Sequence, residues 1–271
     1  MDRSRKYDRP VQIAEGVFWV GSRDESANLF CNPYLIIEGG QAVLIDSGSR
    51  SDFAVVMMKI LQAEIDPAQI VALIYQHYDP DLCGSMPNFI DICDNPGLRL
   101  FSETSNKLFL SYYIHRDRYD LIHSINENDF RFTFNNRSLR FIPTPYAHNP
   151  GSFVTYDEKT RTLFTSDLFG SFSTEWDLFI ELSEECYTCK DYHNCPNRRP
   201  HCPFPDMLAF HKNVMPCEKA LSHAMRKIKE LDMDMVAPQH GSVLNRKRDI
   251  LFIADTLSSL KGVGIDAIVH E

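Results

Sequence analysis

The stretch "QHYDPDLCGS", residues 76–85, is the most informative part of the sequence for the fold and the function. Its core, His77-Tyr78-Asp79-Pro80-Asp81, places one imidazole and two carboxylates side by side in the chain. It follows the apolar run Val71-Ala72-Leu73-Ile74-Tyr75, which is typical of a buried strand. Three potential metal ligands at the end of a strand predict a metal site, and the mixture of donors indicates which metal it would hold.

The same arrangement, an apolar strand followed by a ligand-type side chain, recurs later in the chain. His148 stands in "PTPYAHNPGS", Asp167 in "TLFTSDLFG" and His240 in "APQHGSV". Loops that leave strands at one edge of a layered fold can converge on a single site, where ligands usually bind. The sequence therefore predicts one site built from His77, Asp79, Asp81, His148, Asp167 and His240.

Strands and helices are expected in two successive sets. The first set has strand patterns at 17–20, 34–37, 42–45, 71–75 and 98–101, with helical patterns at 51–65, up to about residue 93, and at 104–114. The second set has strand patterns at 130–134, 139–142, 152–156, 162–165 and 235–237, with helices resuming near Phe210 and at 217–231 and 245–260. This order predicts an α/β (α+β) fold, an αββα sandwich of two mixed sheets flanked by helices, as a single domain over residues 1–271.

Charge and hydropathy exclude several partners. The chain carries 28 lysines and arginines against 37 aspartates and glutamates, a net charge of −9. Such a charge argues against nucleic acid and against an anionic membrane as main partners. The N-terminus is polar and no apolar run of membrane-spanning length follows, so a cytoplasmic protein is expected.

Taken together, these motifs resemble the metallo-β-lactamase superfamily, and within it the oxygen-binding diiron branch that includes the diiron domain of flavodiiron proteins. The resemblance rests on the ordered ligand pattern and on Asn32-Pro33-Tyr34, Asp46-Ser47-Gly48 and Pro238-Gln239-His240-Gly241. It implies a first iron held by His77, Asp79 and His148, a second held by Asp81 and His240, and Asp167 as the bridge between them.

Two positions depart from the family pattern. Asp79 stands where the family usually has the longer glutamate, and Leu82 stands where hydrolases of the superfamily have a histidine. Dizinc hydrolases use a nitrogen-rich ligand set. Replacing imidazoles with Asp79 and Leu82 makes the site more oxygen-rich, which favours iron or manganese over zinc. Leu82 is also expected to leave an open coordination position beside an apolar side chain on the second iron.

A second candidate metal site lies in a segment rich in cysteine, proline and charge, at about 184–206. Its four cysteines are Cys186, Cys189, Cys195 and Cys202. In a chain without an export signal such a cluster indicates metal binding more than disulfides, and either zinc or a [4Fe–4S] cluster would fit. The family resemblance does not extend to this segment, which we interpret as an insertion. Cys31, Cys83, Cys93 and Cys217 have the pattern of scattered small apolar residues.

The resemblance implies a protein that binds or reduces O2, or NO, as an oxygen sensor or as the oxygen-reactive part of a reductase system. The sandwich and its insertion account for all 271 residues. Electrons or signals would therefore pass to or from a redox or signalling protein partner, and a homodimer is compatible with the sequence. Two alternatives stay open: a dinuclear metallohydrolase acting on a thioester, lactone or phosphodiester, and a scaffold protein whose metal site is only structural.

Overall fold

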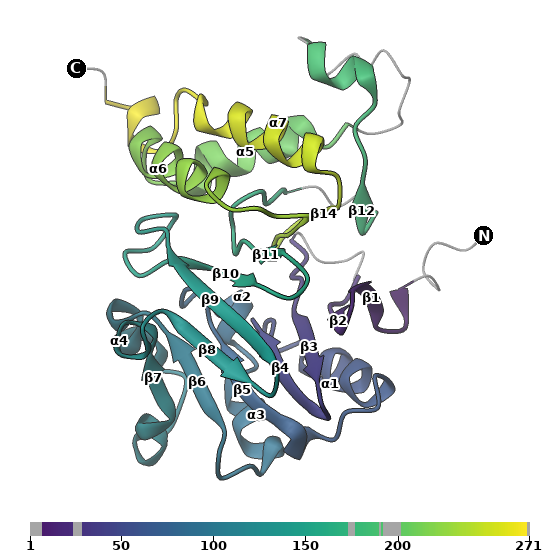
Figure 1. Ribbon diagram of the computed structural model, residues 1–271. Helices are drawn as coiled ribbons and strands as arrows, with labels where there is room; N and C mark the ends of the chain where they lie inside the picture. Colours follow the sequence, from purple (N-terminus) through teal and green to yellow (C-terminus); the bar gives the residue numbers. More distant parts are fainter. Residues whose placement is uncertain (1–6, 24–28, 173–176, 190, 192–201, 270–271) are drawn as a thin grey trace.

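Two β-sheets face each other, and helices cover the outer face of each (Figure 1). The structure, a computed structural model, describes residues 7–23, 29–172, 177–189, 191 and 202–269. Each sheet has seven strands within those residues. The αββα sandwich of two mixed sheets predicted from the sequence is thereby confirmed.

The first sheet follows the order of the chain. Its strands are β1 (Val11–Ala14), β2 (Val17–Trp19), β3 (Tyr34–Glu38), β4 (Gln41–Ile45), β5 (Ile70–Ile74), β6 (Arg99–Ser102) and β7 (Ile122–Ser124). Pairing is antiparallel up to β4 and parallel from β4 to β7. Gly39 and Gly40 close the β3–β4 hairpin, both with positive φ, the backbone conformation that a two-residue turn of this kind requires.

The second sheet has the order β12-β14-β13-β11-β10-β9-β8. In chain order its strands are β8 (Arg131–Phe134), β9 (Arg137–Pro143), β10 (Phe153–Asp157), β11 (Thr162–Phe164), β12 (Phe179–Ile180), β13 (Met235–Ala237) and β14 (Val243–Leu244). The pair β11 and β13 is parallel, so both strands end at the same edge of the sheet.

Three apolar clusters hold the four layers together. The one between the sheets is rich in aromatic side chains, among them Trp19, Phe101, Phe141 and Phe164. A second cluster packs the first sheet against α1 (Phe53–Gln62), α2 (Pro80–Cys83), α3 (Met86–Cys93) and α4 (Lys107–Leu110). The third packs the second sheet against α5 (Phe204–Val214), α6 (Glu218–Lys229) and α7 (Lys247–Ser258).

The predicted helices differ from the observed ones where proline and polar residues intervene. The helical stretch up to residue 93 is broken into α2 and α3, each with a proline in its first turn. The expected helix at 104–114 is a 3₁₀ turn, Thr104–Asn106, followed by the four-residue α4. Within the described ranges, none of the helices combines the length and the apolar character that crossing a membrane requires.

Candidate metal centre

The loops that leave four strands bring the six predicted ligands to one end of the sandwich. His77 follows β5, and Asp79 and Asp81 lie at the start of α2, just beyond it. His148 lies in the β9–β10 connection, Asp167 follows β11, and His240 follows β13. All six side chains belong to one connected group of short contacts, as the sequence predicts.

Asp167 is the centre of this group, because its two carboxylate oxygens face different histidines. Oδ2 lies 2.8 Å from Nε2 of His148 and 3.9 Å from Nε2 of His77. Oδ1 lies 3.5 Å from Nε2 of His240. One carboxylate thus reaches toward two separate sets of donors, which is the geometry expected of a ligand shared by two metal ions.

The remaining two carboxylates divide between the same two sets. Oδ2 of Asp79 lies 3.2 Å from Nε2 of His148 and 3.8 Å from that of His77. Oδ2 of Asp81 lies 3.1 Å from Nε2 of His240. The shortest contacts thus pair Asp79 with the two histidines His77 and His148 and pair Asp81 with His240, while ligand atoms of His77, Asp79 and Asp81 also lie within 4.8 Å of one another. The assignment of each carboxylate to one metal ion stays a prediction.

The pattern of buried and partly exposed side chains is consistent with cation binding at this site. His77, Asp167 and His240 are buried, whereas Asp79 and Asp81 are about one-third exposed. Oδ1 of Asp167 is buried and accepts no hydrogen bond. A buried carboxylate oxygen without a partner is costly, and a metal ion would satisfy it. The residues present thus fit a dinuclear metal centre that small molecules reach from the exposed side.

Neighbouring groups fix which ring nitrogen faces the site. Nδ1 of His77 is 2.8 Å from Oγ of Ser166, and Nδ1 of His240 donates to the carbonyl of Phe30 at 2.8 Å. Both rings therefore turn Nε2 toward the site, as outer hydrogen bonds do in known metal centres. Asn149 donates to Oδ1 of Asp79 at 3.0 Å and leaves Oδ2 of that carboxylate for the site.

In the protein without metal, Asp167, His148 and His240 favour their charged forms. Burial by itself would raise the pKa of the Asp167 carboxyl, but the surrounding imidazoles hold that pKa well below its usual range. Burial would lower the pKa of His148, whereas contacts with Asp167 and Asp79 raise it to about 10. The pKa of His240 is likewise raised well above its usual value, since nearby carboxylates outweigh burial. A cation bound here would take the place of these protons.

The position of Leu82 follows from the short helix α2. Its side chain is fully buried in the cluster between the first sheet and its helices. Leucine supplies no ligand atom, so the half of the site with Asp81 and His240 has fewer donors than the other half. The open coordination position beside Leu82 stays a prediction.

Four further residues near the site were not predicted to be part of it. Sγ of Cys31, which sequence patterning placed among scattered apolar residues, lies 3.7 Å from Oδ2 of Asp81. Gln239 donates to the same oxygen at 3.2 Å, and Ser166 contacts His77 as described. Nε2 of His211 accepts a hydrogen bond from the backbone of Phe169 in the loop that carries Asp167. Cys31, Ser166 and Gln239 stand next to the quoted motifs in the chain, which is their only sequence signal, and His211 has no such signal.

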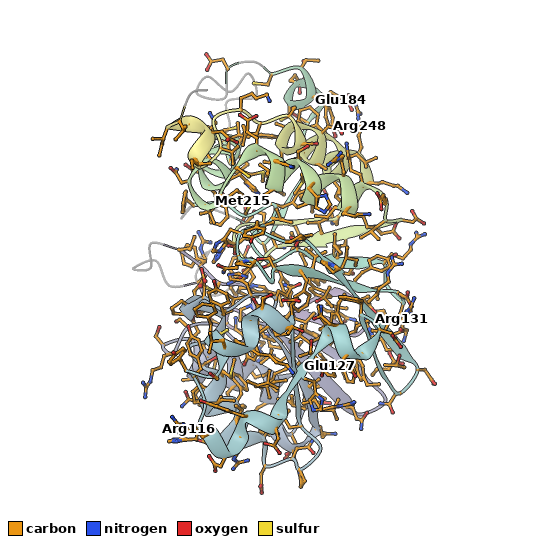
Figure 2. The ribbon with its side chains drawn as sticks, turned by 90° about the vertical axis from the view of Figure 1, so that its left-hand side faces the viewer. Arg116, Glu127, Arg131, Glu184, Met215 and Arg248 are labelled. Atoms are coloured by element: carbon orange, nitrogen blue, oxygen red, sulfur yellow. The ribbon has the colours of Figure 1, made fainter. Side chains whose placement is uncertain are left out.

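The cysteine-rich insertion begins on the outer side of the helix layer. Its 3₁₀ turn, Glu184–Thr188, packs on α7, where Arg248 pairs with Glu184 and lies over the ring of Tyr187 at 3.9 Å (Figure 2). Cys186 and Cys189 carry free thiols, Cys202 is half-buried just before α5, and Cys195 lies outside the described residues. The groups of three potential ligands found among described residues all lie at the strand-end site, so metal binding by the insertion stays a prediction.

Comparison with known proteins agrees with this geometry. A family model described as ODP family beta lactamase matches residues 29–241, a range that contains all six candidate ligands. The type A flavoprotein fprA of Rhodobacter capsulatus is 26% identical over 254 residues, which are 89% of this chain and 54% of that protein. The anaerobic nitric oxide reductase flavorubredoxin of Aeromonas salmonicida is 28% identical over 194 residues, 65% of this chain and 36% of that protein. The chain thus spans about half the length, or less, of these curated relatives.

Solved structures of the same fold cover nearly the whole chain. The peroxy diiron species of chemotaxis sensor ODP aligns with a TM-score of 0.73 at 22% identity, over 96% of this chain and 98% of that one. Rubredoxin oxygen:oxidoreductase from Desulfovibrio gigas aligns with a TM-score of 0.76 at 19% identity, over 92% of this chain and 61% of that one. At these identities the likeness establishes the fold. Together, the family model and the curated flavoprotein relatives confirm the resemblance to the flavodiiron-like branch of the metallo-β-lactamase superfamily.

Proposed function

This chain belongs to the ODP family of beta lactamases, and from that premise we propose that it is a non-haem diiron protein that binds O2 or NO. The observation that supports the proposal most directly is the placement of Asp167, whose two oxygens face different histidines. In this proposal the first iron is held by His77, Asp79 and His148, the second by Asp81 and His240, and Asp167 is shared.

The donor set supports iron over zinc. Three carboxylates and three imidazoles give an oxygen-rich site, and such a site suits iron or manganese better than the nitrogen-rich sets of dizinc hydrolases do. When bound, two ferrous ions would supply the electrons and the coordination positions for a diatomic ligand. That chemistry separates the proposal from the metallohydrolase alternative, which needs only a Lewis acid and a metal-bound hydroxide.

The chain's own residues would orient the ligands and admit the gas. Ser166 and the carbonyl of Phe30 hold two imidazoles with Nε2 toward the site, and Asn149 holds Asp79. The partly exposed edge of the site provides a short path from solvent for a small molecule.

We further propose that the protein senses O2 rather than reducing it rapidly, and that it passes the signal to a protein partner, as a monomer or a homodimer. The likeness to the chemotaxis sensor ODP, which covers almost all of both chains, supports sensing. Because the Aeromonas relative is named a nitric oxide reductase, we propose NO as a second candidate ligand. We also propose that residues 1–271 form one folding unit with the insertion at about 184–206, whose cysteines would bind zinc or an iron–sulfur cluster.

The experiment is anaerobic purification, followed by analysis of iron, zinc and acid-labile sulfide and by mixing of the ferrous protein with O2. We expect two irons per chain at the strand-end site, O2 uptake equal to the amount of diiron centre, and then no further uptake. Repeated uptake with a simple reductant would indicate a reductase instead. Ester hydrolysis by a zinc form, with no reaction of the iron form with O2, would contradict the proposal.

A variant pair checks the shared ligand. Asp167→Ala should lose metal from both halves of the site, because neither ion then keeps its ligand count. Asp91→Ala, which removes an exposed carboxylate from α3, should keep two irons and the optical spectrum. Two irons and an unchanged spectrum in Asp167→Ala would show that the ligand assignment is wrong.

A further inference from the structure

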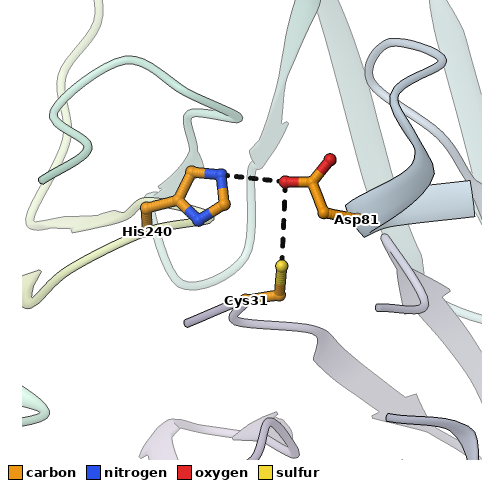
Figure 3. Close-up of side chains that lie close together, drawn as sticks. All are labelled: Cys31, Asp81 and His240. Atoms are coloured by element: carbon orange, nitrogen blue, oxygen red, sulfur yellow. Dashed lines mark hydrogen bonds and ion pairs between the residues drawn. The ribbon is translucent and has the colours of Figure 1, made fainter. Parts of the chain in front are cut away.

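A sulfur donor lies in the half of the site that has fewer donors. Sγ of Cys31, a carboxylate oxygen of Asp81 and a ring nitrogen of His240 lie within 4.8 Å of one another, and the three side chains converge on one space (Figure 3). Sγ of Cys31 is 3.7 Å from Oδ2 of Asp81, and Nε2 of His240 is 3.1 Å from the same oxygen. Cys31 is buried, in the segment that leads into β3.

A second observation indicates that this space holds a ligand. Oδ1 of Asp167 is buried and has no hydrogen bond, and it lies 3.5 Å from Nε2 of His240. The other ring nitrogen of His240 is occupied by the carbonyl of Phe30, the residue before Cys31. The hydrogen bond that orients the histidine and the thiol therefore come from one short piece of backbone, which fixes their relative placement.

We propose that Cys31 is a thiolate ligand of the second metal ion. The inference rests on the proposed dinuclear site and deepens it. Asp81, His240 and the shared Asp167 supply three protein donors, and Leu82 supplies none where superfamily hydrolases have an imidazole. Cys31 gives the fourth, which completes the coordination number that a thiolate- and imidazole-bound divalent ion commonly adopts in proteins.

The chemistry balances. Binding breaks the S–H bond of Cys31, releases its proton to solvent and forms a metal–sulfur bond with no change in oxidation state. Three carboxylates and one thiolate then carry four negative charges, which match two divalent ions in a largely buried site. A soft donor on one metal only would make the two ions inequivalent and raise the preference of the second position for thiophilic metals.

The test uses cobalt and zinc in the full chain, with Cys186, Cys189, Cys195 and Cys202 replaced by serine to remove the other cluster. We expect two Co2+ per chain, a thiolate-to-cobalt charge-transfer band in the near ultraviolet, and, in the zinc form, X-ray absorption from one sulfur at about 2.3 Å from a metal. Adding Cys31→Ser should abolish the band and lower the affinity for the second metal ion by at least about 10-fold, because even residues that only hydrogen-bond to a ligand contribute that much to affinity. Adding Cys217→Ser instead should change neither.

The outcomes separate this inference from the proposed function. Two bound metals without sulfur scattering, or a band that persists in Cys31→Ser, would overturn the role of Cys31 and leave the dinuclear site standing. Fewer than two metals per chain would overturn both. Should Cys31→Ser fail to fold, the X-ray absorption of the parent protein still decides the question.

Discussion

Asp46, the residue directly after the central strand β4, is a buried carboxylate just outside the proposed metal site. Its two oxygens accept hydrogen bonds from the backbone and the side chain of Gln76, at 3.2 and 3.1 Å. Burial is the largest influence on its pKa, which rises to about 7 despite these bonds, and the carboxylates of Asp167 and Asp81 raise it further. In the metal-free protein Asp46 therefore titrates near neutrality, far above the usual value of about 3.9.

This shift predicts how stability depends on pH. The folded state holds the proton more tightly than the unfolded state, so the contribution of Asp46 is full below about pH 4 and is lost as pH rises to about 7. Asp46→Asn removes the titration, and its amide can pair with Oε1 of Gln76, a buried oxygen that has no hydrogen bond. The free energy of unfolding of the variant relative to the parent should therefore rise by on the order of 4 kcal/mol between pH 4 and pH 8, because folding moves the pKa of Asp46 from about 3.9 to about 7.

Denaturant unfolding of the metal-free proteins across this pH range measures the gain. Ser47→Ala, a neutral change at the neighbouring residue, should alter stability by an amount that does not depend on pH. A constant difference between Asp46→Asn and the parent would show that Asp46 does not carry the titration.

At the scale of elements, α5 anchors the loop that presents Asp167. His211 on α5 is buried, its Nδ1 donates to the carbonyl of Met207, and its Nε2 accepts the backbone N–H of Phe169 at 3.1 Å. Burial lowers the pKa of His211 to about 4, so the ring is neutral near pH 7 and can accept that bond. Packing is also close at Gly170, where a Cβ would lie 2.6 Å from the carbonyl oxygen of Asp167 and 2.8 Å from the ring of Phe210.

We predict that His211→Leu leaves the buried N–H of Phe169 without an acceptor. The cost at pH 8 should be about 1–3 kcal/mol of unfolding free energy, together with weaker metal binding through the displaced loop. His211→Gln can place an oxygen near the lost nitrogen and should recover part of both. Asn213→Ala, an exposed change on the same helix, serves as the control. Unfolding curves and metal titrations of the three variants check this, and unchanged metal binding in His211→Leu would contradict the anchoring role.

The elements show why some features could be predicted from sequence and others could not. Strands such as 71–75 and the helix at 245–260 carry strong apolar patterns, and the structure places β5 at Ile70–Ile74 and α7 at Lys247–Ser258. The two-residue strands β12 and β14 show no such pattern, since they exist through pairing with each other and with β13. Cys31 and His211 escaped prediction for the same reason: their roles come from contacts with Asp81 and Phe169, which are distant in sequence.

At the scale of the whole molecule, a buried arginine of the second sheet forms an ion pair within its own sheet and a hydrogen bond to the first sheet, at the end far from the metal site. Arg137 at the start of β9 pairs with Asp157 at the end of β10, with nitrogen–oxygen distances of 3.0 and 2.5 Å, and both side chains are fully buried. Nη1 of Arg137 also donates to the carbonyl of Glu15, between β1 and β2 of the other sheet, at 3.1 Å. His148 lies in the connection between the opposite ends of the same two strands.

Replacing Arg137 therefore tests whether the stability of the sandwich can change without a change in metal binding at the site. Arg137→Met leaves the carboxylate of Asp157 buried without its cation, and breaking a buried pair in this way costs about 3–5 kcal/mol. Arg131 on the adjacent strand β8 lies at the surface (Figure 2) and pairs with Glu158 through one contact of 2.9 Å, so Arg131→Met should cost less than about 1 kcal/mol. Both variants should still bind two metals where they are folded, because neither residue touches a candidate ligand.

Denaturant unfolding and metal counting on the same samples of both variants measure stability and metal binding together. A loss of metal in folded Arg137→Met, with Arg131→Met intact, would mean that the far end of the sandwich controls the site and that the two properties are coupled.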